Sequence, residues 1–243
     1  MVRFFVDPDQ LDGEMIILDD KNAGHAKVLR LKEGEEVLVC DGNGRESLCA
    51  VIGPENGKYI LSVKESRASS SEAAVRVSIY IAFPKADKLE HVIQKATELG
   101  AYEIVTFPSA RCVSKPDEKS LKKKLERWQK IAASAAEQSG RGIIPEVIVL
   151  PSFTLALERA AKADLPIMFY ENEHASTLRM ALKDSSFQTV SLLSGPEGGL
   201  EEREVEMAKG AGLRICTLGR RILRCETAPL CGLSAVMYAS GEF

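Results

Sequence analysis

The sequence predicts an α/β fold with a mostly parallel sheet, preceded by a small β-rich domain. From residue 75 onwards, hydrophobic runs typical of strands alternate with segments of helical period. Such alternation indicates helices layered on a parallel sheet. Residues 35–64 instead contain short apolar runs separated by turns rich in glycine and asparagine, which is typical of hairpins.

The first domain is expected to span residues 1–68. Three runs in it predict short strands, at residues 36–40, 48–52 and 59–63, in a small antiparallel barrel or sandwich. A polar, serine-rich linker at 67–72 follows. The second domain is expected to span residues 73–243.

Strands and helices alternate through the second domain. The pattern predicts strands at 75–83 and 103–107, helices at 86–100 and 119–138, and further strands near 146–150, 166–170, 189–194 and 214–218. Ligands of such sheets bind at the carboxyl ends of the strands. Glu171, Gly195 and Gly219 all fall at these ends.

Composition excludes some classes of protein. No apolar run approaches the ~20 residues needed to span a bilayer, and the first residues do not form a signal peptide, so a cytoplasmic protein is expected. The six cysteines form no C-x-x-C pair, and with three histidines a metal site is not expected. The net charge of −3 argues mildly against nucleic-acid binding, although local basic patches matter more.

Two glycine-rich turns, at residues 194–200 and 218–228, each follow a hydrophobic run and precede helical sequence. Glycines let the backbone approach a ligand, and a helix start offers free N–H groups. The first turn matches neither the dinucleotide fingerprint nor the P-loop, and alone it is equally well read as an ordinary turn. Together, the two turns suggest one shared pocket.

The second turn contains several charged residues close together in the sequence. Arg220, Arg221, Arg224 and Glu226 lie close together around apolar residues. Closely packed arginines repel one another unless an anion meets them. Arg220 and Arg221 can equally be solvated surface residues, whereas Arg224 and Glu226 border the predicted helix start.

Two segments are locally basic. Residues 21–32 contain lysines and arginine without an acid, and residues 111–130 are rich in both cations. Such patches suit phosphate contacts. The second is also explained as the solvated face of an amphipathic helix, since Leu121, Leu125 and Trp128 recur at helical spacing.

The two turns resemble the carboxy-terminal signature of the SPOUT-class RNA methyltransferases, and within them the bacterial family that methylates N3 of a uridine in 16S ribosomal RNA. The resemblance extends in order along nearly the whole chain. Its motifs are Arg3-Phe4-Phe5, His25, Val28-Leu29-Arg30, Asp41-Gly42, Lys88-Leu89-Glu90, residues 94–100, Arg111-Cys112, residues 127–132, residues 137–141 and Pro145.

This resemblance implies a catalytic domain tied in a deep trefoil knot, with S-adenosylmethionine held by the knotted loops. It also implies that the first domain is a PUA-like RNA-binding barrel and that the protein is a homodimer. The expected partner is 16S ribosomal RNA or the small ribosomal subunit. A catalytically idle RNA-binding or ribosome-assembly protein with the same fold is the alternative, and a phosphate-transfer enzyme is disfavoured because no P-loop is present.

Site residues follow from the turns and from the resemblance. Arg224 is expected to stabilise a uridine anion and Glu226 to take its proton, although Glu226 could equally cap the following helix or bind the methionine amine. The residues expected to bind the cofactor are Glu171, Leu193, Gly195, Gly198, Leu218, Gly219, Ile222, Leu223 and Thr227. Those expected to contact RNA are Arg3, His25, Lys27, Arg30, Gln138 and Arg141.

Overall fold

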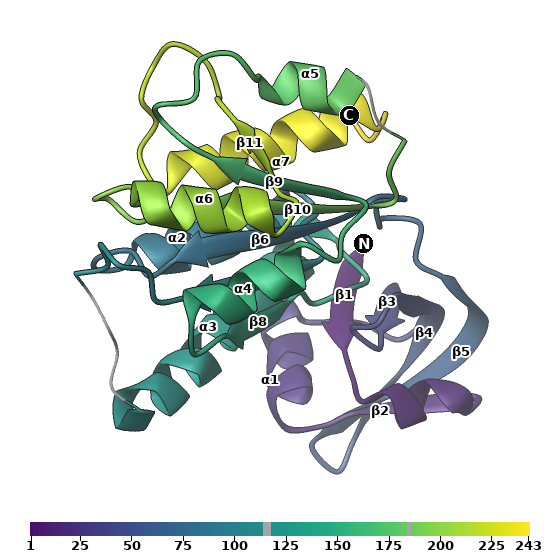
Figure 1. Cartoon of the computed structure of the whole chain (residues 1–243). Helices are drawn as coiled ribbons and strands as arrows, with labels where there is room; N and C mark the ends of the chain where they lie inside the picture. The colour runs from purple at the N-terminus through teal and green to yellow at the C-terminus, as the bar shows by residue number, and fades with distance from the viewer. Residues whose placement is uncertain (114–117, 184–185) are drawn as a thin grey trace. The chain divides into compact units, whose positions relative to one another are not determined.

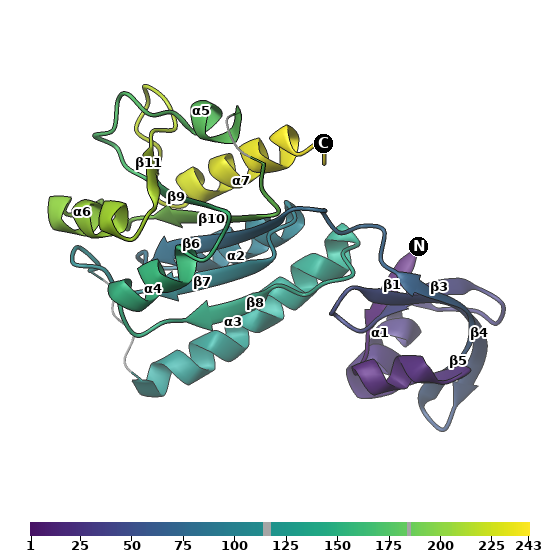
Figure 2. The same cartoon turned by 45° about the vertical axis from the view of Figure 1, so that its right-hand side comes forward.

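The computed structural model describes residues 1–113, 118–183 and 186–243, and the chain in it forms two compact units (Figures 1 and 2). The smaller unit contains residues 1–72 and 136–144, and the larger contains residues 73–135 and 145–243. The short segment 136–144 therefore clusters with the amino-terminal unit, an assignment that the linear domain prediction did not make.

The smaller unit is built on a five-stranded sheet in the order β1-β3-β4-β5-β2. Its elements are β1 (Val2–Phe5), the 3-10 helix η1 (Pro8–Asp12), β2 (Met15–Leu18), α1 (Asp20–Leu29), β3 (Glu36–Cys40), β4 (Arg45–Glu55) and β5 (Lys58–Ala68). The three strands predicted from the sequence are confirmed, and two of them are longer than expected. The sequence predicted a wholly antiparallel sheet. This prediction is wrong for one pair of strands, because β1 pairs with β3 in parallel.

The core of this unit comes from alternate residues of its strands. Phe4, Val37, Val39 and Leu61 are fully buried, and they pack with Ile16 and Leu18 of β2 in one hydrophobic cluster. Alternation of this kind is what a sheet with one covered face requires.

The larger unit contains a six-stranded sheet in the order β11-β9-β10-β6-β7-β8, and every neighbouring pair in it is parallel. The strands are β6 (Arg76–Ala82), β7 (Glu103–Phe107), β8 (Glu146–Val149), β9 (Leu165–Phe169), β10 (Thr189–Ser194) and β11 (Arg214–Cys216). All five residues of β7 are buried, which is typical of a parallel strand covered on both faces. The predicted α/β class with a parallel sheet is confirmed.

Helices cover both faces of this sheet. They are α2 (Lys88–Glu98), α3 (Glu118–Ser139), α4 (Phe153–Ala160), α5 (Leu178–Lys183), α6 (Glu202–Gly210) and α7 (Thr227–Ala239). Figure 1 shows α4 and α6 in front of the sheet and α2 and α7 behind it. Helix α7 contacts β6, β10 and α2. It approaches closely because Gly232 faces the Phe169 ring, where any Cβ would collide.

Among the described residues, no helix combines the length and the apolar character needed to cross a bilayer. The same part of the chain holds no group of three metal-ligating side chains suited to a metal ion.

Candidate active site

The loops that follow β9, β10 and β11 surround a cavity of about 680 Å³ in the larger unit. This position, at the carboxyl ends of parallel strands, is where α/β sheets bind ligands. The cavity is lined by Lys88, Phe169, Tyr170, Glu171, Asn172, His174, Ser194, Gly195, Pro196, Glu197, Gly199, Thr217, Leu218, Gly219, Arg220, Arg221, Ile222, Leu223, Arg224, Cys225 and Ala228. Both glycine turns therefore contribute to one pocket.

The turn after β10 is tightly packed. The Gly199 N–H donates to the Pro196 carbonyl at 2.9 Å, and Gly199 has a φ of +68°. A Cβ on Gly199 would collide with the Glu171 carboxylate, and one on Gly195 would lie 2.9 Å from Leu200 Cγ. Glycine at these two positions is thus required by the turn itself and by its contact with the loop after β9.

Gly198 has a different neighbour. Arg111 Nη1 donates to the Gly198 carbonyl at 3.0 Å, and a Cβ on Gly198 would lie 3.1 Å from Arg111 Cβ. Gly198 does not line the cavity. Arg111 therefore supports the turn from outside.

The turn after β11 is more open. Gly219 has a φ of +112°, and a Cβ placed there would find no atom within 4 Å. Thr217 Oγ1 accepts from the Gly219 N–H and donates to the Gly219 carbonyl, both at 3.2 Å. Ile222, which lines the cavity, is 85% exposed. An apolar side chain exposed inside a pocket is suited to pack against a ligand ring.

Three arginines of this turn line the cavity: Arg220, Arg221 and Arg224. All three are exposed, and none has an ion-pair partner among the described residues. Clustered guanidinium groups without counter-ions repel one another, so this edge of the cavity favours an anionic ligand.

Lys88, the first residue of α2, connects the two turns. Its Nζ lies 3.1 Å from Glu197 Oε1 in the first turn and 3.2 Å from Glu226 Oε2 in the second. The hydrogen bond to Glu197, together with that to Glu226, holds the pKa of Lys88 above its ordinary value even though burial opposes this. Lys88 is consequently a protonated cation between two carboxylates.

Both carboxylates are ionised. Burial alone would raise the pKa of Glu226, but hydrogen bonds from its own N–H, from Cys225 and from Lys88 outweigh burial and lower it. Burial likewise opposes ionisation of Glu197, whose pKa is lowered by the N–H of Lys85 and by Lys88. The Cys225 thiol donates to Glu226 at 3.2 Å, and burial together with this bond raises the pKa of Cys225 to about 12.

Six of the predicted cofactor residues line the cavity, whereas Leu193, Gly198 and Thr227 do not. The wall includes Glu171, Gly195, Leu218, Gly219, Ile222 and Leu223, together with the predicted catalytic Arg224. Leu193 is buried within β10, and Thr227 is exposed at the start of α7. Glu226 does not line the cavity but is bonded to Lys88, which does.

One alternative for Glu226 is wrong. Glu226 is the N-cap residue of α7, but its side chain makes no capping hydrogen bond. Lys88 had no assigned role in the sequence prediction, although the Lys88-Leu89-Glu90 motif supported the family resemblance. The Lys88-Leu89-Glu90 motif was the sequence signal that could have identified Lys88 as a site residue.

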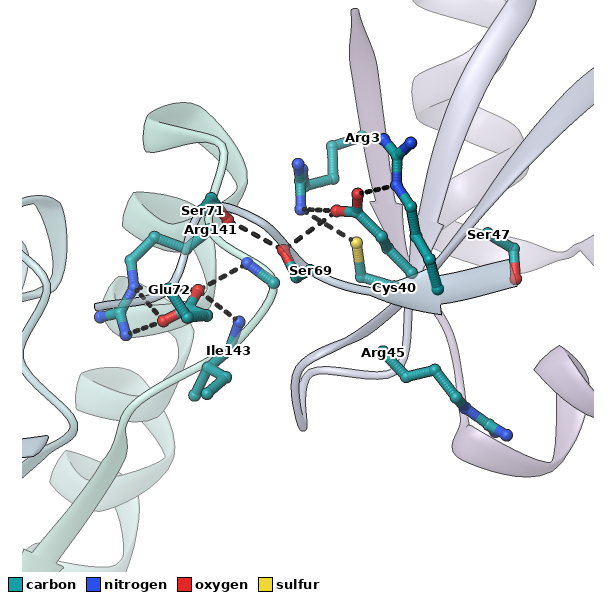
Figure 3. Close-up of polar contacts among 12 residues, drawn as sticks. Arg3, Cys40, Arg45, Ser47, Ser69, Ser71, Glu72, Arg141 and Ile143 are labelled. Atoms are coloured by element: carbon teal, nitrogen blue, oxygen red, sulfur yellow. Dashed lines mark hydrogen bonds and ion pairs between the residues drawn. The ribbon is translucent and has the colours of Figure 1, made fainter. Parts of the chain in front are cut away.

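The predicted RNA contacts all lie in the smaller unit, where Arg3 and Arg141 form ion pairs and are largely buried (Figure 3). Arg3 Nη1 donates to Glu46 Oε2 at 3.1 Å and to Cys40 Sγ at 3.2 Å. Arg141 Nη2 donates to Glu72 Oε2 at 2.6 Å. Because both guanidinium groups are already bonded, these residues first of all stabilise the unit.

The other predicted contacts are accessible. Lys27, Arg30 and Gln138 are exposed. His25 is half-exposed, and its Nδ1 lies 2.8 Å from Glu137 Oε1. The side chain of Lys21, which belongs to the same basic segment, lies outside what the structure describes.

Comparison with known families gives the class of protein. A model of the RNA methyltransferase domain matches residues 71–237, and a model of the RNA methyltransferase PUA domain matches residues 18–64. A parallel sheet with two glycine turns around a cavity, preceded by a PUA-like domain, thus defines an RNA methyltransferase. The enzyme class expected from the sequence is confirmed.

Individual relatives identify the family within this class. The ribosomal RNA small subunit methyltransferase E of Bacillus subtilis is 40% identical over 218 residues, which cover 87% of this chain and 84% of the relative. The crystal structure of the same enzyme from Neisseria gonorrhoeae, bound to S-adenosyl methionine, is 29% identical with a TM-score of 0.85 and covers 98% of this chain and 97% of its own. A methyltransferase from Legionella pneumophila in complex with the bound cofactor SAM is 27% identical with a TM-score of 0.81, covering 98% and 97%. The chain belongs to the ribosomal RNA small subunit methyltransferase E family.

Proposed function

We propose that the protein methylates N3 of a specific uridine in 16S ribosomal RNA, with S-adenosylmethionine as the methyl donor. The relatives named for the small-subunit ribosomal RNA support the substrate, and those crystallised with the donor support the cofactor. The observation that carries the proposal is the cavity that both glycine turns line, with three arginines on its wall that have no ion-pair partner among the described residues.

The cavity fits the methyl donor. Its volume of about 680 Å³ lies within the range of roughly 300–1,000 Å³ typical of small-molecule sites. The open space above Gly219 and the exposed Ile222 provide a backbone edge and an apolar surface for an adenine ring. When bound, the donor supplies a methyl group that its sulfonium centre makes strongly electrophilic. Of the residues that we assign to the donor, Glu171, Gly195, Leu218, Gly219, Ile222 and Leu223 line the cavity. Leu193, Gly198 and Thr227 do not line it, and we assign to them the support of the turns around it.

The uridine needs activation. Its N3–H is a weakly acidic imide, and the nitrogen becomes a good nucleophile only when the proton leaves. A guanidinium group near O2 or O4 stabilises the resulting anion. Arg224 takes this role because it lines the cavity, is exposed and has no carboxylate partner among the described residues.

Glu226 is assigned as the proton acceptor. It is ionised, as a base must be, but its lowered pKa makes it a weak one. Contact with the methionine amine of the donor is the remaining alternative for this carboxylate. The two roles differ in their effect on donor affinity, and this difference is testable.

The RNA is assigned to the smaller unit. Lys27 and Arg30 are exposed cations on and just after α1, and His25 and Gln138 belong to the same unit. Such residues supply phosphate contacts without sequence information. A homodimer with the pocket near the subunit interface, and action in the cytoplasm, complete the proposal on the strength of the family resemblance.

The test is transfer of labelled methyl groups from S-adenosylmethionine to purified 16S ribosomal RNA and, in parallel, to small ribosomal subunits. We expect incorporation of one methyl group per RNA in at least one of the two substrates. The alternative, an idle RNA-binding protein, predicts RNA binding with no incorporation in either.

A further inference from the structure

The ammonium group of Lys88 contacts both glycine-rich turns. Besides its contacts with Glu197 and Glu226, Lys88 lies 3.8 Å from Cys225 Sγ. Glu197 Oε1 also accepts from the Lys85 N–H at 2.9 Å, so the loop after β6 is bonded to the turn after β10. Lys88 is therefore the point where the loops after β6, β10 and β11 are joined.

We infer that Lys88 is a positioning residue of this active site: its ammonium group holds the turn after β10 and the turn after β11 in the shape that receives the methyl donor. This inference rests on the proposed function. It assigns a distinct role to Lys88, because Lys88 forms ion pairs with a carboxylate of each turn, whereas the glycines carry no charge and the arginines belong to one turn only.

The charges around Lys88 explain why a cation is needed. Glu197 and Glu226 both bond to the same Nζ, at 3.1 Å and 3.2 Å, so their carboxylates lie close together. Two carboxylates at such a distance repel one another unless a cation lies between them. Lys88 also lies 3.8 Å from the Cys225 thiol, and the other charged residues of the cavity wall are Glu171, Arg220, Arg221 and Arg224.

Removal of Lys88 has two consequences. The turns lose their common partner and are pushed apart by the two carboxylates. The pKa of Glu226 and that of Glu197 rise, because the cation that favours their ionised forms is gone. A merely structural lysine would produce neither a selective loosening of both turns nor a change in the titration of Glu226.

The experiment compares Lys88→Met and Lys88→Arg with the wild type and with a matched control. The control is Lys95→Met, which removes a lysine of the same helix whose partner is Glu98, away from the cavity. Three quantities are measured: affinity for S-adenosylmethionine by calorimetry, amide hydrogen exchange at residues 195–200 and 219–226 without the donor, and the pH dependence of single-turnover methylation. Circular dichroism verifies that each variant is folded.

We expect Lys88→Met to weaken donor binding by about tenfold, the effect of losing two partly exposed ion pairs. Exchange should rise in both turns, and the acid limb of the pH profile should move to higher pH. Lys88→Arg should restore most of the affinity and the acid limb, and Lys95→Met should leave all three quantities unchanged. Glu197→Gln added to Lys88→Met should recover part of the affinity, because it removes the uncompensated repulsion.

Failure of the proposed function and failure of the inference about Lys88 give different results. If the wild type binds no donor, the proposed function fails. If the wild type binds the donor and Lys88→Met binds it equally well with unchanged exchange in both turns, the role of Lys88 is overturned. Should Lys88→Met be unfolded, Lys88→Gln replaces it, and donor affinity and an acid limb equal to those of the wild type in that variant contradict the inference.

Discussion

Arg141 and Glu72 form an ion pair in which Arg141 Nη2 lies 2.6 Å from Glu72 Oε2, with both side chains largely buried (Figure 3). Glu72 Oε1 also accepts from the backbone N–H groups of Gly142 and Ile143, at 2.8 Å and 3.0 Å. One carboxylate thus holds the segment 136–144 to the end of the amino-terminal unit. Arg141, expected as an RNA contact, lies in this cluster.

We predict that Glu72→Ala releases this segment. Breaking a buried ion pair leaves an uncompensated charge and costs about 3 kcal/mol. The amides of Gly142 and Ile143 should then exchange much faster by mass-spectrometric hydrogen exchange. Glu65→Ala is the control, because the Glu65 side chain is 59% exposed and lies 3.9 Å from its Arg67 partner. Unchanged protection at both amides in Glu72→Ala would refute the role of Glu72.

The same cluster shows where sequence reasoning succeeds and where it stops. Strands β7 and β10 were predicted to the residue because each is a short segment rich in apolar and β-branched residues between clear breaks. Strands β1 and β2 were missed, since each lies outside the hairpin pattern of residues 35–64 and pairs with a strand distant in the sequence. Periodicity carries no signal for such pairing.

The site was predictable in a similar way. The glycine turns were found from local spacing, and most of the residues named from them line the cavity. Lys88 had no role because a lysine at the start of a helix is usually solvated, and its carboxylate partners come much later in the chain. Arg3 was assigned to RNA on the family resemblance, and no sequence pattern indicated that Glu46 would bind it. Tertiary ion pairs of this kind are visible only in the structure.

The glycine turns give a second prediction. Gly219→Val should abolish binding of S-adenosylmethionine, because the new side chain enters open space that we assign to the ligand and the backbone at φ +112° disfavours it. Gly195→Val should also abolish binding, but by disrupting the turn at Leu200. Calorimetry measures both affinities.

A matched control separates strain from ligand contact. Gly212 has a φ of +91° with no atom near its Cβ position, and it does not line the cavity. Gly212→Val should therefore be similarly strained yet bind the donor normally. Normal binding by Gly219→Val in a folded protein would remove this turn from the cofactor site.

RNA affinity should reside in the exposed cations of the smaller unit. Lys27→Ala and Arg30→Gln should each weaken RNA binding and reduce the slope of log affinity against log salt by about 1, with donor affinity intact. Filter binding across salt concentrations measures the slope. Lys58→Ala, at the exposed lysine that begins β5, is the control and should leave the slope unchanged. If neither Lys27→Ala nor Arg30→Gln changes the slope, RNA does not bind at these two cations.

Arg224 and Glu226 make the chemical step testable. Arg224→Lys keeps the charge but loses the planar fork, so turnover should fall much further than donor affinity. Glu226→Gln should give a rate that rises with pH as hydroxide replaces the base. In the wild type, the lowered pKa of Glu226 keeps the carboxylate ionised down to acid pH, so its rate should be flatter there. Single-turnover methylation with saturating donor measures all three proteins.

The alternative role of Glu226 predicts different results in these experiments. If Glu226 binds the methionine amine instead, Glu226→Gln should bind the donor poorly at every pH and show no rise in rate when the donor is saturating. Wild-type rates in both variants would exclude the proposed mechanism while leaving the methyltransferase assignment intact.

The most direct test of the proposed function is mass mapping of methylated nucleotides in 16S ribosomal RNA from cells with the protein, without it, and with Arg224→Lys in its place. We predict one uridine that carries a methyl group on N3 in the first cells, carries none in the second and is under-methylated in the third. An identical methylation pattern with and without the protein would contradict the proposal.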